Sequence, residues 1–308
     1  MTPCSPITTI RSLPQWALLC LVVVVSAAAL LAACGGSGGG SSPTPGAPIT
    51  STAAPGPSSS PATTPTAAPS ATTTLALYFL RGEALGVAER RVPQTTRPAT
   101  AAMEALLAGP SASESAAGLT SAVPSGTRLL GLSIDGTTAR VDLSAQFAAG
   151  GGSLSMQARV AQVVYTLTQF RTIRTVAFML EGSALDALGG EGLMLGESQR
   201  RADWSGFEPA IFVERPGVGA ALSSPLALSG TASVFEGSFT ARLIDGAGHG
   251  IGRTQVQASA GAPERGRFRT TLSFSTTAQN GTLIVYDQSM EDGSRQNEVR
   301  IPLTFAQE

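Results

Sequence analysis

Hydrophobic and polar residues follow four different patterns along the chain. Residues 16–33 are almost wholly apolar, and residues 35–74 are mainly Gly, Ser, Pro, Thr and Ala with no charged residue. From Leu75 apolar residues recur at both strand and helix spacings, and from about Glu208 only the strand spacing of two remains. This α+β pattern predicts an apolar leader over 1–33, a linker over 34–74 and two folded domains, over 75–202 and 208–306.

The first folded domain is predicted to be α/β, with helices packed on a small sheet. LALYFL and RTVAFMLEG have the composition of strands, and Leu130, Leu132 and Ile134 alternate before the Asp135-Gly136 turn of a hairpin. In chain order, the predicted elements are a strand over 75–80, a helix over 97–110, a hairpin over 127–144, a helix over 153–170 and a strand over 174–182.

The apolar faces of the two predicted helices define how they should pack. In the first helix Met103, Leu106 and Leu107 share a face, and Gly109-Pro110 ends the helix. In the second helix Ser153 is a candidate N-cap. The predicted apolar face of this second helix comprises Leu154, Val160, Val163, Val164, Leu167 and Phe170.

The second folded domain is predicted to be an immunoglobulin-like antiparallel β-sandwich. Apolar residues at every second position, as over residues 299–305, indicate strands with one buried face. Asp245-Gly246, Asn280-Gly281 and Asp292-Gly293 are predicted turns. Because Pro302 cannot donate a main-chain hydrogen bond, the last strand is expected at a sheet edge.

The apolar leader ends in a segment with a chemistry of its own. Leu31-Ala32-Ala33-Cys34 resembles the lipobox of bacterial lipoproteins, in which small residues precede a cysteine that is diacylated and becomes the new N-terminus. The resemblance implies that Cys34 is the lipidation site and that residues 1–33 are a signal peptide. The alternative is a transmembrane anchor, since the apolar run is at the lower length limit for spanning a bilayer. The small residues before Cys34 and the polar linker after it favour the lipobox.

Composition narrows the class of protein further. Cys4, Cys20 and Cys34 leave no cysteine for a disulfide within the folded domains. The formal net charge is -1, a near-neutral balance that argues against a nucleic-acid partner. The linker is too poor in apolar residues to fold and is predicted to be a disordered spacer. We therefore expect a lipid-anchored, extracytoplasmic protein on the outer face of the cytoplasmic membrane.

Both folded domains resemble known families. ALLAGP, GLTSAVPSGTRLLGLSIDGTTARVDLSAQF and RVAQVVYTLTQFRTIRTVAFMLEG are similar to the GerMN domain of sporulation and spore germination, over about residues 75–201. SSPLALSGTASVFEGSF, GRFRTTLSF and GTLIVYDQSMEDGSRQNEVRIPL resemble the immunoglobulin-like domain of bacterial spore germination. These resemblances imply an extracytoplasmic lipoprotein with no known enzymatic activity that assembles through contacts between domains. Since the GerMN domain also occurs in organisms that make no endospores, the resemblance does not establish germination as the role.

No catalytic or metal-binding pattern is recognised in the sequence. His249, in DGAGHGIG, is the only histidine and has no cysteine partner in the folded domains, so we interpret it as a solvated loop residue. A Ser–His–Asp site using Asp245 would need a nucleophile elbow, and the sequence has no G-x-S-x-G motif. The prediction is a protein that is not an enzyme and has no metal and no cofactor.

Acidic residues provide weaker candidates for chemistry. Glu83 with Glu89, and Glu181 with Asp186, could be acid–base pairs for cleaving wall glycans, but no pattern places either pair across a cleft. The sequence DQSMEDG loosely resembles a calcium loop without the EF-hand spacing or flanking helices, so a turn with solvated acids is favoured. The candidate residues within this loop are Asp287, Ser289, Glu291, Asp292 and Gly293.

Aromatic residues and one further loop are candidate binding surfaces, each with a structural alternative. Tyr165 and Phe170 lie on the second predicted helix and are expected in the core. Trp204 and Phe207 lie between the domains, where a packed hinge is favoured over an exposed patch. Glu236, in VFEG, belongs either to a binding face or to a bulge or turn before the next strand.

Two functions from different classes follow from these observations. The first is a tethered interaction or assembly module of the cell envelope, whose partners are envelope proteins or further copies of itself. The second is a module that binds peptidoglycan or another carbohydrate. Sugar-binding faces usually carry aromatic platforms, and Trp204, Tyr78, Tyr165 and Tyr286 are the only Trp and Tyr residues of the folded domains. This scarcity favours the first function.

Overall fold

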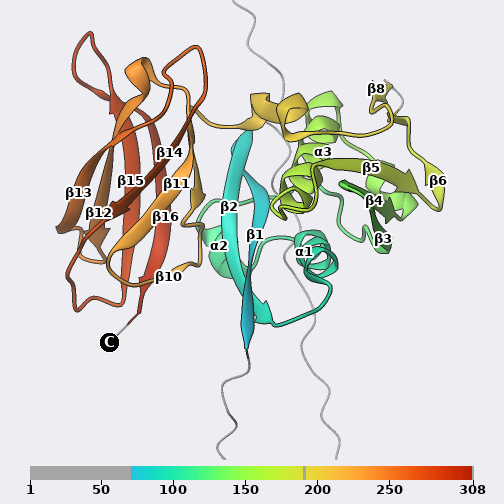
Figure 1. Ribbon diagram of the computed structural model, residues 1–308, viewed down its shortest axis with the longest axis horizontal. Coiled ribbons are helices and arrows are strands. Elements are labelled where there is room, and N and C mark those ends of the chain that lie inside the picture. The colour runs from blue at the N-terminus through green and yellow to red at the C-terminus, as the bar shows by residue number, and fades with distance from the viewer. Residues whose placement is uncertain (1–70, 190–191, 307–308) are drawn as a thin grey trace, which may run out of the picture. The chain divides into compact units, whose positions relative to one another are not determined.

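The structure is a computed structural model that describes residues 71–189 and 192–306 (Figure 1). The predicted signal peptide, the lipobox residues 31–33, the lipidation site Cys34 and nearly all of the predicted linker lie outside the described residues. The described residues belong to one compact unit, Pro65–Glu308. Among them, no helix combines the length and the hydrophobicity needed to cross a membrane.

The fold begins with a hairpin that is longer than the predicted strand over 75–80. Strands β1 (Thr72–Arg81) and β2 (Ala84–Pro93) pair antiparallel along their whole length. Gly82 lies in the turn between them with a φ of +63°, which suits glycine. β2 is absent from the predicted elements, because its apolar and charged residues do not alternate strictly.

The next elements build a four-stranded sheet in the order β3-β4-β5-β6. β3 (Leu129–Asp135) and β4 (Thr138–Leu143) form the predicted hairpin, and β5 (Thr175–Leu180) lies parallel to β4. α3 (Ser153–Leu167) is the crossover that these parallel neighbours require. The shorter elements of this α/β region are α1 (Pro98–Leu107), α2 (Ala112–Ala116), η1 (Ala145–Ala148), β6 (Ser183–Ala184), β7 (Ala187–Leu188), β8 (Leu193–Met194) and η2 (Arg201–Phe207).

The position of α3 matches the predicted arrangement of helices packed on a small sheet only in part. Figure 1 shows α3 between the β1–β2 hairpin and strands β4 and β5, and every residue from Ala158 to Leu167 is buried. The Tyr78 amide donates to Thr166 Oγ1 (3.2 Å), and Gln162 Nε2 donates to the Tyr78 carbonyl (3.1 Å). α3 is therefore a central layer, and polar side chains on its hairpin side are buried through hydrogen bonds to the main chain.

Both ends of α3 also differ from the prediction. Ser153 is the first helical residue, the N-cap is Gly152, and no side chain caps the helix. Leu154 is 52% exposed, and Phe170 lies beyond the last helical residue. The first turn of α3 is exposed to solvent, so the helical spacing of its apolar residues does not report burial there.

The two helices that follow the hairpin differ in how far the sequence predicts them. α1 buries Met103 and Leu106 fully and Leu107 partly, which confirms its predicted face. α2 is absent from the prediction, yet it begins with a capping box. The Glu114 amide donates to Ser111 Oγ (3.3 Å), and the Ser111 amide donates to Glu114 Oε2 (2.7 Å).

The remaining strands form the predicted β-sandwich, antiparallel except for the short β10 beside β16 (Figure 1). One sheet has the order β14-β11-β9 and the other the order β10-β16-β15-β12-β13. Between them Phe239 and Phe268 meet edge-on, with 4.9 Å between ring centroids. The strands are β9 (Ile211–Arg215), β10 (Ala221–Leu222), β11 (Leu226–Ala232), β12 (Ser238–Asp245), β13 (Gly250–Gln257), β14 (Gly266–Leu272), β15 (Asn280–Gln288) and β16 (Arg295–Phe305).

Three sequence features of the sandwich have different outcomes. Gly293 has a φ of +71°, which agrees with the predicted Asp292-Gly293 turn. Asn280-Gly281, predicted to be a turn, opens strand β15 instead, where a Cβ on Gly281 would lie 2.4 Å from the Ile244 carbonyl oxygen. The last strand, β16, is not the edge strand as predicted, because the short β10 lies outside it. β10 pairs only with Thr304 and Phe305, however, so no described strand pairs with Pro302 on that side.

Candidate functional site

The α/β region and the sandwich are joined by main-chain hydrogen bonds along β2. The Glu89 amide donates to the Val218 carbonyl and the Val218 amide donates to the Val87 carbonyl, both at 2.8 Å. Gly217 permits this approach, because a Cβ on it would lie 3.0 Å from the Glu89 nitrogen and from the Val87 oxygen. The loop after β9 thus adds a short parallel bridge to the hairpin.

Beside this bridge lies a polar cluster centred on Arg201, the first residue of η2. Arg201 Nη1 donates to Glu214 Oε1 on β9, and Tyr78 OH on β1 donates to the same oxygen at 2.7 Å. Arg201 Nη2 donates to Tyr78 OH (2.9 Å), and Arg201 Nε donates to Thr168 Oγ1 (2.8 Å). The guanidinium also lies over the Tyr165 ring, 4.7 Å from its centroid. One carboxylate of the sandwich therefore binds two elements of the α/β region.

The carboxylate of Glu208 extends this cluster into the sandwich. Tyr165 OH donates to Glu208 Oε1 (2.6 Å), and Thr231 Oγ1 donates to Glu208 Oε2 (2.9 Å). Arg265 Nε lies 3.1 Å from the same oxygen. Tyr165 is thus buried as predicted, and its hydroxyl is in addition a contact of the junction.

Burial and neighbouring charges shift the pKa values of this cluster. Burial, aided by Glu214, raises the pKa of the Tyr78 hydroxyl far above its ordinary value, and burial with the Glu208 hydrogen bond does the same for Tyr165. Burial alone would lower the pKa of Arg201, but Tyr78 and Glu214 raise it. The hydroxyls stay protonated and Arg201 stays cationic at physiological pH, so the cluster is a fixed structural link and not an acid–base pair.

The burial of Trp204 and Phe207 argues against an exposed patch and favours the packed alternative. Both side chains are buried, with 6.4 Å between their ring centroids. Trp204 Nε1 donates to Gln199 Oε1 (3.1 Å), so its polar atom has a partner as well. Glu236 lies in the turn η3 (Phe235–Gly237) directly before β12, with a φ of +51°, which is the structural alternative for this residue.

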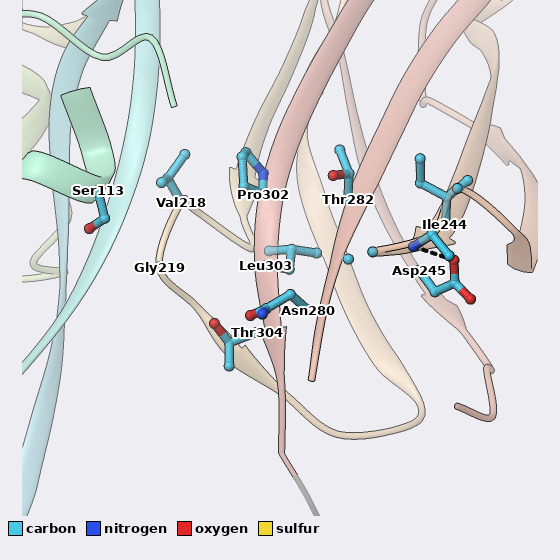
Figure 2. A pocket seen from close by; sticks show the side chains of 14 residues that line it. Ser113, Val218, Gly219, Ile244, Asp245, Asn280, Thr282, Pro302, Leu303 and Thr304 are labelled. Atoms are coloured by element: carbon cyan, nitrogen blue, oxygen red, sulfur yellow. Dashed lines mark hydrogen bonds between the residues drawn. The ribbon is translucent and has the colours of Figure 1, made fainter. Parts of the chain in front are cut away.

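A groove with a volume of about 630 Å³ lies beside α2, at the ends of strands β12, β15 and β16. Figure 2 shows Ser113 and Val218 on one side of the groove, with Asn280, Thr282 and Thr304 on the strands opposite. The lining consists of hydroxyl, amide, aliphatic and main-chain groups. It contains one ionisable residue, Asp245, and no aromatic ring. Such a surface can hydrogen-bond a polar ligand but has no pair of groups for acid–base catalysis.

Asp245 and His249 form a turn, as the solvated-loop interpretation predicts. Asp245 Oδ1 accepts from the amides of Ala247 (3.0 Å) and His249 (2.8 Å), and Oδ2 lies 3.3 Å from His249 Nδ1. These contacts, led by the His249 amide, lower the pKa of Asp245. The side chain of His249 is 80% exposed. The pair therefore stabilises the β12–β13 turn.

The acids of the DQSMEDG loop have separate local roles. Asp287 is buried on β15 and accepts from Asn297 Nδ2 (2.9 Å). Asp292 accepts from the Ser294 amide (3.0 Å), which stabilises the predicted turn. Among the described residues, no group of three or more His, Cys, Asp and Glu side chains is placed to hold a metal ion.

The proposed glutamate and aspartate pairs also have local roles. Glu83 is exposed in the β1–β2 turn, whereas Glu89 accepts from the Gly217 amide at the junction (3.1 Å). Glu181 accepts from the Ala145 amide (2.8 Å), and Asp186 is exposed. None of these four acids lines the groove of Figure 2.

Strand β3 exposes apolar side chains at a sheet edge. Its strand neighbour within the described ranges is β4 alone. Leu130 is 44% exposed and Ile134 is 49% exposed, although both belong to the alternating set that predicts the strand. Edge strands have unpaired main-chain groups and usually carry polar side chains that discourage association. We call Leu130, Ile134 and the free edge of β3 the edge patch.

The partners in the polar cluster are not among the residues predicted to meet. Arg201, Glu208 and Glu214 are separated by short distances in sequence, but they meet Tyr78 and Tyr165 only in the folded chain. The one local signal is the presence of these charged residues around the predicted domain boundary. Charged residues at a boundary usually indicate a solvated linker, so this signal does not identify a cluster.

Two family models match the regions that the fold separates. Germane, described as sporulation and spore germination, matches residues 76–186. Gmad2, described as the immunoglobulin-like domain of bacterial spore germination, matches residues 210–294. The chain therefore combines a Germane region with a Gmad2 region and is related to sporulation and germination proteins. The resemblance seen in the sequence is confirmed.

Solved structures resembling parts of the chain include three bacterial examples. A proposed lipoprotein from Clostridium perfringens is 21% identical with a TM-score of 0.33, covering 44% of this chain and 93% of that one. The tandem GerMN domains of the sporulation protein GerM from Bacillus subtilis are 17% identical with a TM-score of 0.38, covering 76% of this chain and 61% of theirs. The first GerMN domain of GerM is 23% identical with a TM-score of 0.35, covering 43% of this chain and 100% of that one. No curated protein matches the chain.

Proposed function

We propose that this protein is a membrane-anchored, extracytoplasmic lipoprotein that acts without catalysis as an interaction or assembly module of the cell envelope. The edge patch carries the interaction role. Leu130 and Ile134 place exposed apolar area beside a strand edge that no described strand pairs with, a combination that favours pairing with another protein. The partner is another envelope protein or a second copy of this chain.

The sequence before the described residues supports the anchor. Cys34 would carry the diacylglyceryl group after cleavage behind Leu31-Ala32-Ala33. As a flexible coil, the linker of about 40 residues would span roughly 35 Å, enough to hold the folded part away from the bilayer. The protein would then present the edge patch to partners at the outer face of the cytoplasmic membrane.

The junction supports an assembly role because it couples the α/β region to the sandwich. The main-chain bridge at Val218 and the carboxylates of Glu208 and Glu214 hold the two together. A partner bound to one region would therefore have a fixed relation to the other, as an assembly module requires.

In-cell cross-linking with mass spectrometry of the recovered proteins tests this function. The wild type should recover the same envelope proteins, or itself, in repeated experiments. The double variant Leu130→Asp/Ile134→Asp should lose them, while Met290→Asp, at a residue 77% exposed on the sandwich, should retain them. If both variants recover the same proteins as the wild type, the edge patch is not the binding surface. Cys34→Ser should move the protein from the membrane fraction to the soluble fraction if Cys34 is the anchor.

The groove of Figure 2 favours a second function, binding of peptidoglycan or another carbohydrate. Asn280, Thr282 and Thr304 offer the amide and hydroxyl groups that polyols bind, but the lining has no aromatic platform for stacking. Sedimentation with purified peptidoglycan tests it. Binding that is lost in Asn280→Ala/Thr304→Val and retained in Leu130→Asp/Ile134→Asp would replace the interaction role with wall binding.

A further inference from the structure

A smaller cavity, separate from the groove of Figure 2, lies between the hairpin and the sandwich. Its volume is about 220 Å³. β1 and β2 contribute one wall, β9 a second and β16 a third, and most of the lining is aliphatic or aromatic. Lining residues that bear on its chemistry are Arg81, Leu85, Val87, Phe212, Glu298 and Ile301.

Arg81 brings an incompletely paired cation to this apolar cavity. Its Nη1 donates to the Arg300 carbonyl, whereas its Nε is buried and has no hydrogen-bond partner in the part of the chain that the structure describes. No described carboxylate forms an ion pair with Arg81 either, and burial lowers its pKa. A buried donor of a charged group that lacks an acceptor lowers the stability of the fold, so such donors usually have an acceptor in the functional state of a protein.

The only acid in the lining does not serve as that acceptor. Glu298 Oε1 accepts from Arg300 Nε (2.6 Å), and Glu298 Oε2 accepts from Arg295 Nη1 (3.4 Å). Two arginines thus already offset the charge of Glu298, and the surroundings of the cavity carry more positive than negative charge. An anion entering the cavity would meet a favourable potential.

We propose that this cavity binds a short aliphatic carboxylate. The carboxylate would accept hydrogen bonds from the Arg81 guanidinium, which lines the cavity and has no carboxylate partner among the described residues. The aliphatic part would lie against Leu85, Val87 and Phe212. At about 220 Å³ the cavity is smaller than the usual range for drug-sized ligands, which restricts the ligand to a few carbon atoms. The same chemistry is offered by a free short-chain acid and by the C-terminal residue of a peptide.

Calorimetric titration of the purified full-length protein with hexanoate tests the proposal on the wild type alone. Hexanoate should bind saturably, and hexanamide, which has the same chain without the charge, should bind about tenfold more weakly or not at all. Equal binding of the two compounds, or no saturable binding of hexanoate, would overturn the proposal. A second titration with the peptide acetyl-Ala-Ala-Leu distinguishes the sources: tighter binding than hexanoate assigns the site to a chain terminus, weaker binding to a free acid.

Variants then test the role of Arg81. Arg81→Gln should weaken hexanoate binding about tenfold or more, and Arg81→Lys should recover part of it, because lysine keeps the charge but not the planar fork. Arg171→Gln, at an exposed arginine, is the matched control and should bind as the wild type does. If Arg81→Gln fails to fold, Ala84→Leu keeps Arg81 and narrows the cavity, and it should also weaken binding. Wild-type affinity in Arg81→Gln, or in a folded Ala84→Leu variant, would overturn the site.

Discussion

The α/β region and the sandwich bury their polar side chains to different extents. In the α/β region α3 is covered on several sides, and Arg159, Gln162 and Thr166 are fully or almost fully buried in it. In the described part of the sandwich, the buried polar side chains are Thr240 and Asp287. A helix in a central layer meets main-chain groups of the surrounding loops and strands and needs polar side chains to pair with them. Sheet strands pair their main chains with each other, so the space between two sheets can remain apolar.

Arg159 shows how much of the α/β region depends on such a side chain. Its Nη1 donates to the carbonyls of Phe147 (2.6 Å) and Ala149 (3.1 Å), and its Nη2 donates to the carbonyl of Gly150 (2.9 Å). Burial lowers its pKa, and one of its acceptors, the carbonyl of Phe147, belongs to a fully buried residue. One guanidinium therefore satisfies the loop that leads into α3.

The largest effect should come from Arg159→Met, which keeps much of the side-chain volume and removes these donors. We expect the free energy of unfolding to fall by about 3 kcal/mol, because several acceptors would lose a charged partner. Urea denaturation measures the change, with Arg171→Met at an exposed arginine as the control, expected within about 0.5 kcal/mol of the wild type. Equal stability of the two variants would mean that the α/β region does not depend on its buried polar residues.

In the sandwich, the sensitive position should instead be one of close packing. Gly281→Ala would place a Cβ 2.4 Å from the Ile244 oxygen and 2.5 Å from the Phe305 ring, so the free energy of unfolding should fall by about 2 kcal/mol. Gly131→Ala on β3 is the control, since its Cβ would lie 3.8 Å from Asp142 Cβ, an ordinary contact. Thermal unfolding compares the two, and a Gly131→Ala loss as large as that of Gly281→Ala would contradict this explanation.

A matched pair of threonines sharpens the comparison. Thr166→Val removes the acceptor of the buried Tyr78 amide and should cost about 1–2 kcal/mol of unfolding free energy. Thr240→Val removes a bond to Gln255 Oε1, a flexible side chain that can turn to water, and should cost about 0.5 kcal/mol. Urea denaturation of both variants should preserve this order. The reverse order would show that buried polar contacts matter more in the sandwich.

The smallest effect concerns pH and belongs to the α/β region. Burial alone would raise the pKa of Glu114, but hydrogen bonds from Arg90 and Ser111 lower it below its ordinary value. Because the folded pKa is the lower one, this stabilisation is present above the pKa of the unfolded glutamate, about 4.3, and is lost as the pH falls through the folded pKa. Glu114→Gln should therefore lose less stability than the wild type on acidification below about pH 5. Melting temperatures measured across this range test it, and parallel curves would exclude the contribution.

Local patterns predict most elements of this chain, because spacing along the sequence reports which side of one element is buried. The face of α1 with Met103 and Leu106, the hairpin of β3 and β4 and the alternation of β16 were all predicted in this way. The pattern fails where burial does not follow one face. Leu154 has the helical spacing of a core residue and is exposed, whereas Arg159 is buried, because the exposure of each depends on what surrounds α3.

The sequence by itself determined the two regions, the sandwich class of the second and the resemblance to sporulation and germination families, and it predicts a lipidated cysteine ahead of both. Only the tertiary structure decided that α3 is a central layer and that Tyr78, Arg201 and Glu214 join the two regions. It also decided that β3 exposes apolar side chains and has β4 as its only strand neighbour among the described residues. The physical reason is the range of the interactions. Periodicity and turn chemistry act between near neighbours in the chain, while burial and side-chain pairing depend on which distant segments meet.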